Sequence, residues 1–117
     1  MFQYEEKRFH CPFEMALDMV SRKWNSLVLY HLSSGTKRYS ELKRLIEGIT
    51  QKMLTQTLRD LEKYRLIHRE VYPVVPPKVE YSLTEYGEEV LPILEQIQAF
   101  GEAMYGRYEA EGLIKEI

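Results

Sequence analysis

The sequence predicts an α+β fold that is mostly helical and forms a single domain over residues 1–117. Three observations support this prediction. Apolar residues recur every three or four positions along most of the chain, one central region changes to a strand-like composition, and the last third carries one long helical pattern. With 44% hydrophobic residues the chain can bury a core, and its single cysteine excludes an internal disulfide.

The first half of the chain contains two helical patterns. Pro12 can occupy the first turn of a helix, and apolar residues then recur at helical spacing: Phe13, Ala16, Leu17 and Val20. A second apolar stripe runs from Trp24 to Leu32, and we expect Gly35 to close that helix as a C-terminal glycine. His31 lies on this stripe, which favours a hydrogen-bonded core histidine.

Two shorter helices follow, joined by a turn. Ser40 is the expected N-cap of the third helix, whose apolar side consists of Leu42, Leu45 and Ile46. Gly48 makes the turn, and Thr50 is the expected N-cap of a fourth helix that runs to about Tyr64. Two helices joined by a turn that contains glycine have the helix-turn-helix arrangement.

A β-hairpin is predicted next. Residues 67–71 and 79–83 are rich in β-branched and aromatic types, which favour strands. Pro73, Pro76 and Pro77 lie between them, lack backbone donors and stiffen the tip. Lys78 is expected at this tip, so the hairpin resembles the wing of a winged helix-turn-helix, which contacts phosphates or the minor groove.

The final pattern is a long helix that begins after Thr84, its expected N-cap. Pro92 lies inside the helix and should kink it. The apolar residues alternate at steps of four and three, a coiled-coil-like seam, at Val90, Leu94, Ile97, Gly101, Met104 and Tyr108.

The charges are distributed unevenly. The net charge of −2 alone argues against a nucleic-acid binder. However, residues 37–69 contain nine basic and four acidic residues, whereas residues 85–117 contain eight acidic and two basic ones. This distribution predicts one surface that faces a polyanion and one solvated surface. Ordinary charged helix faces remain an alternative on charge alone.

The fourth helix has two chemically different edges. Leu54, Leu58 and Leu61 fall on one edge and should point into the core. The opposite edge carries side chains that can read base edges or bind phosphates, at Lys52, Thr55, Gln56, Arg59 and Lys63. With neighbours at the ends of other elements, the predicted DNA-binding residues are Lys23, Lys37, Arg38, Ser40, Thr50, Gln51, Lys52, Thr55, Gln56, Arg59, Lys63 and Lys78.

Several motifs in order resemble the HxlR-type regulators, which are related to the MarR winged-helix proteins. The similarity covers roughly residues 10 to 105. The matching stretches are Cys11-Pro12, Lys23-Trp24, Leu29-Tyr30-His31-Leu32, Arg38-Tyr39-Ser40-Glu41-Leu42, Gly48-Ile49-Thr50-Gln51-Lys52-Met53-Leu54, Leu58-Arg59-Asp60-Leu61-Glu62, Pro76-Pro77-Lys78-Val79-Glu80-Tyr81-Ser82-Leu83-Thr84 and Gly87.

The resemblance implies a homodimer that binds a pseudo-palindromic operator and regulates transcription. Residues 1–21 and 85–117 would supply the dimerisation helices, and residues 22–84 approximately the DNA-binding core. Two recognition helices would then enter successive major grooves about 34 Å apart. The expected dimer contacts are Phe13, Leu17, Val90, Leu94, Ile97, Gly101, Met104 and Tyr108.

The chain departs from the family pattern at two places. The family usually has a small turn with glycine where this chain has Lys63-Tyr64-Arg65. A left-handed conformation costs Arg65 more free energy than it costs glycine, so we expect the fourth helix to end differently. Ser21-Arg22 also stands where the family often has glycines.

Cys11 is a candidate redox sensor. It lies at the start of the first helix near Lys7, Arg8 and His10, and a helix N-terminus with nearby cations stabilises a thiolate. Some similar proteins sense oxidants or electrophiles through a cysteine at this place. The available chemistry is an intersubunit disulfide, a mixed disulfide with a small thiol, or alkylation. A cysteine that only packs at the dimer interface is the alternative.

Other function classes are less well supported. His10, His31 and His68 have no metal-ligand spacing, and no cofactor-binding or nucleophile motif is present, so we expect no enzyme, metal or cofactor. No apolar run is long enough for a bilayer, and no signal peptide is expected, which indicates a cytoplasmic protein. A winged helix that binds another protein rather than DNA remains an alternative. A ligand site near the aromatic residues of the final helix is a further one, less favoured than a dimer core.

Overall fold

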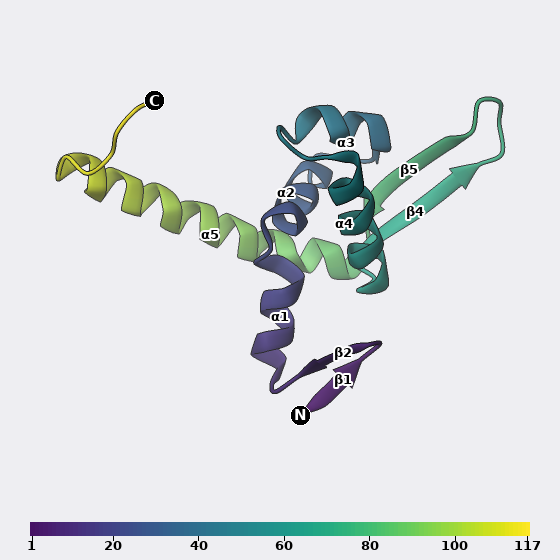
Figure 1. Cartoon of the computed structure of the whole chain (residues 1–117), viewed down its shortest axis with the longest axis horizontal. Coiled ribbons are helices and arrows are strands. Elements are labelled where there is room, and N and C mark those ends of the chain that lie inside the picture. Colours follow the sequence, from purple (N-terminus) through teal and green to yellow (C-terminus); the bar gives the residue numbers. More distant parts are fainter.

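The computed structural model describes residues 1–117 and consists of five helices and five short strands (Figure 1). In chain order they are β1 (Phe2–Tyr4), β2 (Lys7–Phe9), α1 (Pro12–Val20), α2 (Lys23–Leu32), β3 (Lys37–Arg38), α3 (Tyr39–Leu45), α4 (Gln51–Lys63), β4 (Ile67–Tyr72), β5 (Lys78–Leu83) and α5 (Glu85–Ala110). The predicted α+β fold is confirmed. None of the helices combines the length and the hydropathy that crossing a bilayer requires.

The starts of three helices follow the predicted signals. Pro12 is the first residue of α1. Thr50 caps α4 because its hydroxyl accepts a hydrogen bond from the Met53 N–H at 3.1 Å. Thr84 caps α5 in the same way, with the Gly87 N–H as donor at 3.1 Å. Each side chain satisfies a backbone donor that the first helical turn leaves free.

The core lies where α2, α4, the three-stranded sheet and the start of α5 meet. Leu54, Leu58 and Leu61 on α4 are at most 3% exposed, as their spacing predicts. They pack in one cluster with apolar residues of α2 and the sheet, including Val28, Leu29, Leu32, Leu66, Ile67 and Tyr81. Burial of this edge therefore determines which side of α4 faces outward.

The wing is a long antiparallel hairpin of β4 and β5, with β3 on the other side of β5. Ile67 pairs with Leu83 and Tyr72 with Lys78, so the strands exceed the predicted ranges by one residue at the tip. The hairpin projects away from the helical body (Figure 1). Lys78 is the first residue of β5 and not part of the tip, which corrects the predicted position.

The N-terminal residues form an element that the sequence analysis did not predict. β1 and β2 are a two-stranded hairpin in which Phe2 pairs with Phe9. The Tyr4 ring stacks on the Tyr64 ring with centroids 5.4 Å apart. The Tyr4 hydroxyl also donates to the backbone carbonyl of Lys63. The hairpin is therefore held against the C-terminal end of α4.

Ser40 is not the N-cap of α3. The Lys37–Arg38 strand pairs with β5, and the helix begins directly after it at Tyr39. The Glu41 carboxylate accepts a hydrogen bond from the Arg38 N–H at 2.9 Å and so satisfies the free donor at this helix end. Ser40 consequently lies in the first helical turn, with its side chain exposed.

The end of α2 also differs from the prediction. The helix ends at Leu32, and Gly35 lies in the following turn with a φ of 131°, where its N–H donates to the Leu32 carbonyl at 3.1 Å. His31 is not a hydrogen-bonded core residue. Its side chain is partly exposed, and its ring packs edge-on against Tyr30 with centroids 5.4 Å apart.

The expected deviation at the end of α4 is wrong. Arg65 adopts the left-handed conformation with a φ of 59°, as a glycine would. The Leu66 N–H donates to the Leu61 carbonyl at 3.0 Å, and the Arg65 N–H donates to the Glu62 carbonyl at 2.9 Å. These two bonds form a Schellman motif, and burial of Leu66 accompanies it. The two bonds and the buried leucine offset the strain at Arg65.

Gly87 makes a close approach between α5 and the end of α4. A Cβ atom at this position would lie 2.1 Å from the backbone oxygen of Leu66. Only glycine therefore lets the first turn of α5 reach the core.

We predict that Gly87→Ala lowers the free energy of unfolding by about 1–3 kcal/mol, because the backbone must shift to admit the methyl group. Urea denaturation at fixed protein concentration measures this. Gly106→Ala is the matched control, because a Cβ there meets nothing within 4 Å and alanine favours the helix. Equal stability of Gly87→Ala and the wild type would contradict the close packing.

Candidate nucleic-acid interface

The outward side of α4 forms one polar surface. Gln51, Lys52, Thr55, Gln56 and Arg59 line a wide, shallow hollow without any hydrophobic residue. All of them are exposed except Thr55, which is half-buried. The structure thus brings five of the predicted DNA-binding residues together. We refer to this set as the α4 surface.

Hydrogen bonds hold two side chains of the α4 surface in place. The Gln56 amide nitrogen donates to the Asp60 carboxylate at 3.0 Å, which leaves the amide oxygen of Gln56 free to accept. The hydroxyl groups of Tyr39 and Thr55 lie 3.0 Å apart. Tyr39 also donates to the backbone carbonyl of Gln51 at 3.0 Å and so links the start of α3 to the start of α4. Tyr39 is not among the residues predicted from the sequence, because an aromatic residue beside an apolar stripe resembles a core residue.

The start of α3 supplies further cations. Arg38 and Ser40 are exposed, and the Lys37 ammonium donates to the Ser34 hydroxyl at 3.0 Å. Because β3 pairs with β5, Lys37 and Arg38 lie on the same sheet as the wing, and Ser40 follows in the first turn of α3. Lys37, Arg38 and Ser40 therefore present hydrogen-bond donors next to the helix-turn-helix pair.

The other four predicted residues lie outside the α4 surface. Lys78 sits 3.5 Å from the Glu80 carboxylate and above the Tyr72 ring, so its charge is partly satisfied. Lys63 lines a different hollow, together with Glu5 and Glu6 of the N-terminal hairpin. Lys23, at the first turn of α2, packs over the Trp24 ring at 4.6 Å. Thr50 serves mainly as the cap of α4.

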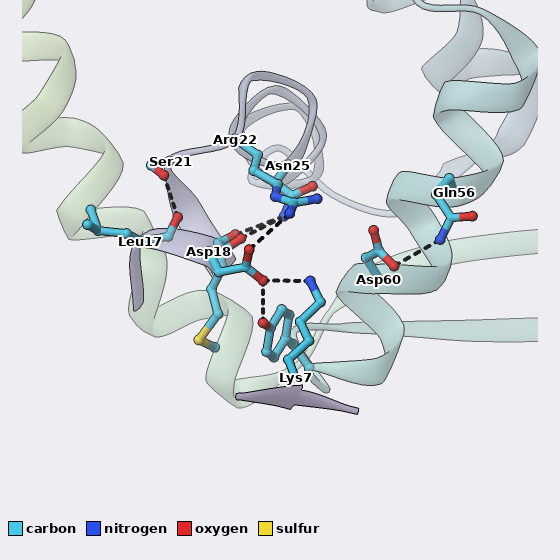
Figure 2. Close-up of polar contacts among 10 residues, drawn as sticks. Lys7, Leu17, Asp18, Ser21, Arg22, Asn25, Gln56 and Asp60 are labelled. Atoms are coloured by element: carbon cyan, nitrogen blue, oxygen red, sulfur yellow. Dashed lines mark hydrogen bonds and ion pairs between the residues drawn. The ribbon is translucent and has the colours of Figure 1, made fainter. Parts of the chain in front are cut away.

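Asp18 joins the N-terminal hairpin, α1 and α4. Its carboxylate accepts from the Lys7 ammonium at 2.7 Å and from the Tyr64 hydroxyl, and Arg22 lies at 3.1 Å (Figure 2). Burial acts to raise the pKa of Asp18, but the hydrogen bonds from Lys7 and Tyr64 and the charges of Lys7 and Arg22 outweigh it and lower the pKa. Burial and the bond to Asp18 raise the pKa of Tyr64.

Cys11 is a free, exposed cysteine immediately before α1. Two of the cations expected around it have other partners. Lys7 binds Asp18, and the His10 ring lies 3.1 Å from the Glu14 carboxylate. The thiol is therefore accessible, but Lys7 and His10 each lie against a carboxylate rather than against the sulfur.

Most of the expected dimer residues are exposed apolar groups. Phe13 is 71% exposed, Leu17 43%, Ile97 52% and Tyr108 41%. Gly101 is also exposed, and Leu94 and Met104 are partly covered. Val90 is different, because it is 6% exposed and belongs to the core of the single chain. It is therefore removed from the expected seam.

The model of the HxlR-like helix-turn-helix family matches residues 19–109 of this chain. The chain belongs to the HxlR-like helix-turn-helix family. Among its relatives is the HTH-type transcriptional regulator YkvN of Bacillus subtilis, which is 52% identical over 106 residues that cover 91% of this chain and 90% of YkvN.

Solved structures agree with this assignment. The redox regulator HypR in its reduced form has a TM-score of 0.79 and 46% identity, covering 86% of this chain and 99% of HypR. The reduced form of the transcriptional regulator YodB from Bacillus subtilis has a TM-score of 0.71 and 36% identity, covering 80% of this chain and 93% of YodB. The resemblance stated from the motifs is thus confirmed. The chain is a transcription regulator with a helix-turn-helix DNA-binding fold, and these relatives are regulators rather than enzymes.

The Asp18 junction predicts a pH dependence of stability. A folded-state pKa below the unfolded value means that the carboxylate stabilises the fold above the unfolded pKa of about 3.9, and this stabilisation is lost as the pH falls through the folded pKa. Asp18→Asn should therefore lower the free energy of unfolding at pH 7 by about 1–3 kcal/mol.

The difference between wild type and Asp18→Asn should shrink as the pH is lowered from about 5 towards 2, because protonation removes the same charge in the wild type. Chemical denaturation at several pH values measures both proteins. Glu14→Gln is the matched control, since Glu14 is an exposed partner of His10. A difference that stays constant with pH would contradict the assignment.

Proposed function

We propose that this regulator is a homodimer that binds duplex DNA sequence-specifically at a pseudo-palindromic operator. One observation carries the proposal: α4 buries its leucine edge and leaves Gln56, Arg59 and Lys52 outward on one continuous polar surface. Glutamine and arginine can make bidentate contacts with adenine and guanine in the major groove. The chain thus has a helix of the right shape and chemistry for base readout.

The proposed contacts fall into two classes. Gln51, Thr55 and Gln56 would meet base edges in the major groove, and Arg59 would lie where those base edges adjoin the flanking backbone. The second class would bind backbone phosphates and fix the register, and it comprises Lys37, Arg38, Ser40, Lys52 and, at the tip end of the wing strands, Lys78. Lys23 and Lys63 lie outside the α4 surface and are left out of this proposal.

The exposed apolar face of α5 supports dimerisation. Ile97, Phe100 and Tyr105 are between 43% and 68% exposed on a helix that extends away from the body (Figure 1). Burial of such side chains on a second copy contributes about 25 cal/mol per Å² of apolar area. Gly101 lies on the same stretch with open space around it, which allows a partner backbone to approach. We assign dimerisation to residues 1–21 and 85–117, with residues 22–84 approximately as the DNA-binding part.

Cys11 is proposed as a sensor of oxidants or electrophiles. Its thiol is exposed at the start of α1, beside the exposed Phe13 of the proposed dimer face. HypR, to which this chain is similar, is named a redox regulator. An oxidant would yield an intersubunit disulfide or a mixed disulfide with a small thiol, and an electrophile would alkylate the sulfur. The simpler role is packing between subunits.

Selection of bound sequences from random duplex DNA tests the proposed function, with the full chain under reducing conditions and after diamide treatment. We expect an enriched inverted repeat under reducing conditions. Its loss or change after diamide, absent in Cys11→Ser, would support the sensor. No enrichment in either state would contradict sequence-specific binding and favour a protein-interaction role.

Substitutions should separate base readout from phosphate contact. Gln56→Ala should weaken binding to the selected site by about 1–3 kcal/mol and leave unrelated duplexes unaffected. Lys78→Ala should weaken binding to all duplexes alike, because phosphates carry no sequence information. Fluorescence anisotropy with a cognate and a scrambled duplex measures both. If Gln56→Ala lowers the affinity for the cognate and the scrambled duplex equally, Gln56 does not read base sequence.

A further inference from the structure

A second hollow lies between α4 and the sheet, next to the α4 surface. It has a volume of about 310 Å³, and Tyr39, Arg59, Glu62, Arg69 and Tyr81 are among the residues that line it. Arg69 belongs to β4 and is not among the DNA-binding residues that the sequence predicted. We refer to this hollow as the arginine groove.

The register of the sheet explains why Arg69 faces the helix. Side chains alternate along a strand, so Arg69 lies on the same sheet face as Ile67, which is buried in the core. Arg69 pairs across the sheet with Tyr81, which is only 8% exposed. The strand therefore directs Arg69 towards α4, at the rim of the core, and Arg59 approaches from the helix.

The charges in the arginine groove are not balanced. Neither Arg59 nor Arg69 has a carboxylate oxygen within 4.0 Å, since neither residue takes part in a salt bridge. Glu62 is the only carboxylate among the lining residues. The two arginines are exposed, and two guanidinium groups beside one carboxylate leave a net positive charge at this hollow, which favours an anion.

The arginine groove is continuous with the α4 surface. Thr55 and Arg59 line both hollows. An anion bound between the two arginines would therefore lie at the edge of the DNA surface that α4 contacts in the proposed complex. On a helix that enters the major groove, this position is next to the sugar-phosphate backbone.

We propose that Arg59 and Arg69 together bind one phosphate of the DNA backbone, between the recognition helix and the base of the wing. This inference rests on the proposed function. Guanidinium groups match phosphate oxygens in a bidentate arrangement, and the Tyr81 hydroxyl can add a donor. The contact would fix the position of α4 in the groove without reading sequence. Inorganic phosphate offers the same oxygen atoms, so the experiment must distinguish a bound phosphate ion from a phosphate of the DNA backbone.

The salt dependence of binding to a mixed-sequence duplex tests the proposal. Wild type, Arg69→Gln, Arg69→Lys and Arg8→Gln are compared between about 50 and 200 mM salt. Arg8→Gln is the matched control, because Arg8 is an exposed strand residue on the N-terminal hairpin without a salt bridge. Thermal unfolding of each variant checks that it folds. In parallel, inorganic phosphate is titrated at constant ionic strength while the side-chain NMR signals of the arginines are followed.

We expect Arg69→Gln to reduce the slope of log K against log salt by about 1 per protomer, with Arg69→Lys and Arg8→Gln at the wild-type slope. If Arg69→Gln and Arg8→Gln have the same slope of log K against log salt, the phosphate contact of Arg69 is overturned. The proposed function still stands in that case, provided that wild-type binding falls steeply with salt. A further outcome is that inorganic phosphate shifts the side-chain NMR signals of Arg59 and Arg69 while Arg69→Gln leaves the salt slope unchanged. That result would assign the arginine groove to a free anion, and it too would overturn the DNA-phosphate proposal. A wild type that binds no duplex overturns both the groove and the proposed function.

Discussion

The burial of one edge of α4 is the constraint on which the rest of the structure depends. Leu54, Leu58 and Leu61 must leave water, and together they fix the rotation of the helix about its axis. The same rotation turns Gln56 and Arg59 outward. The exposed polar surface and the packed core are therefore two consequences of one amphipathic pattern.

Both ends of α4 are held by contacts outside the leucine edge. At the start, Thr50 caps the helix and Tyr39 binds the Gln51 carbonyl. At the end, Tyr64 binds Asp18 and stacks on Tyr4. α4 is thus connected at its C-terminal end to the N-terminal hairpin, which leads directly into the segment that contains Cys11. Figure 2 shows the Asp18 carboxylate between Lys7 of the hairpin and Arg22.

The sequence predicted those features that depend on local chemistry. Helix starts at Pro12, Thr50 and Thr84 agree with the structure because a cap or a proline acts within one turn. The two wing strands agree because prolines separate two β-branched segments. These elements place the α4 surface, so most of the candidate site followed from the sequence.

The features that were missed depend on contacts between distant residues. The N-terminal hairpin turns at Glu5 with a φ of 53° and without glycine, and it is held by Tyr64, which lies far along the chain. Arg65 adopts a left-handed conformation because Leu66 is buried behind it. Val90 looked like a seam residue, but the close approach at Gly87 draws the first turns of α5 into the core. Arg69 faces α4 only because the sheet register directs it there.

The central claim is that α5 pairs two chains so that both α4 surfaces face one side of a DNA duplex. A spin label at Met53→Cys in a Cys11→Ser background tests this directly, because Met53 is an exposed α4 residue outside the proposed contacts. Pulsed electron paramagnetic resonance on the complex with a selected duplex then measures the distance between the two labels. We expect a narrow distribution near one helical turn of DNA, about 34 Å, or near a multiple of it. The absence of dipolar coupling, or a distance that fits no whole number of turns, would contradict it.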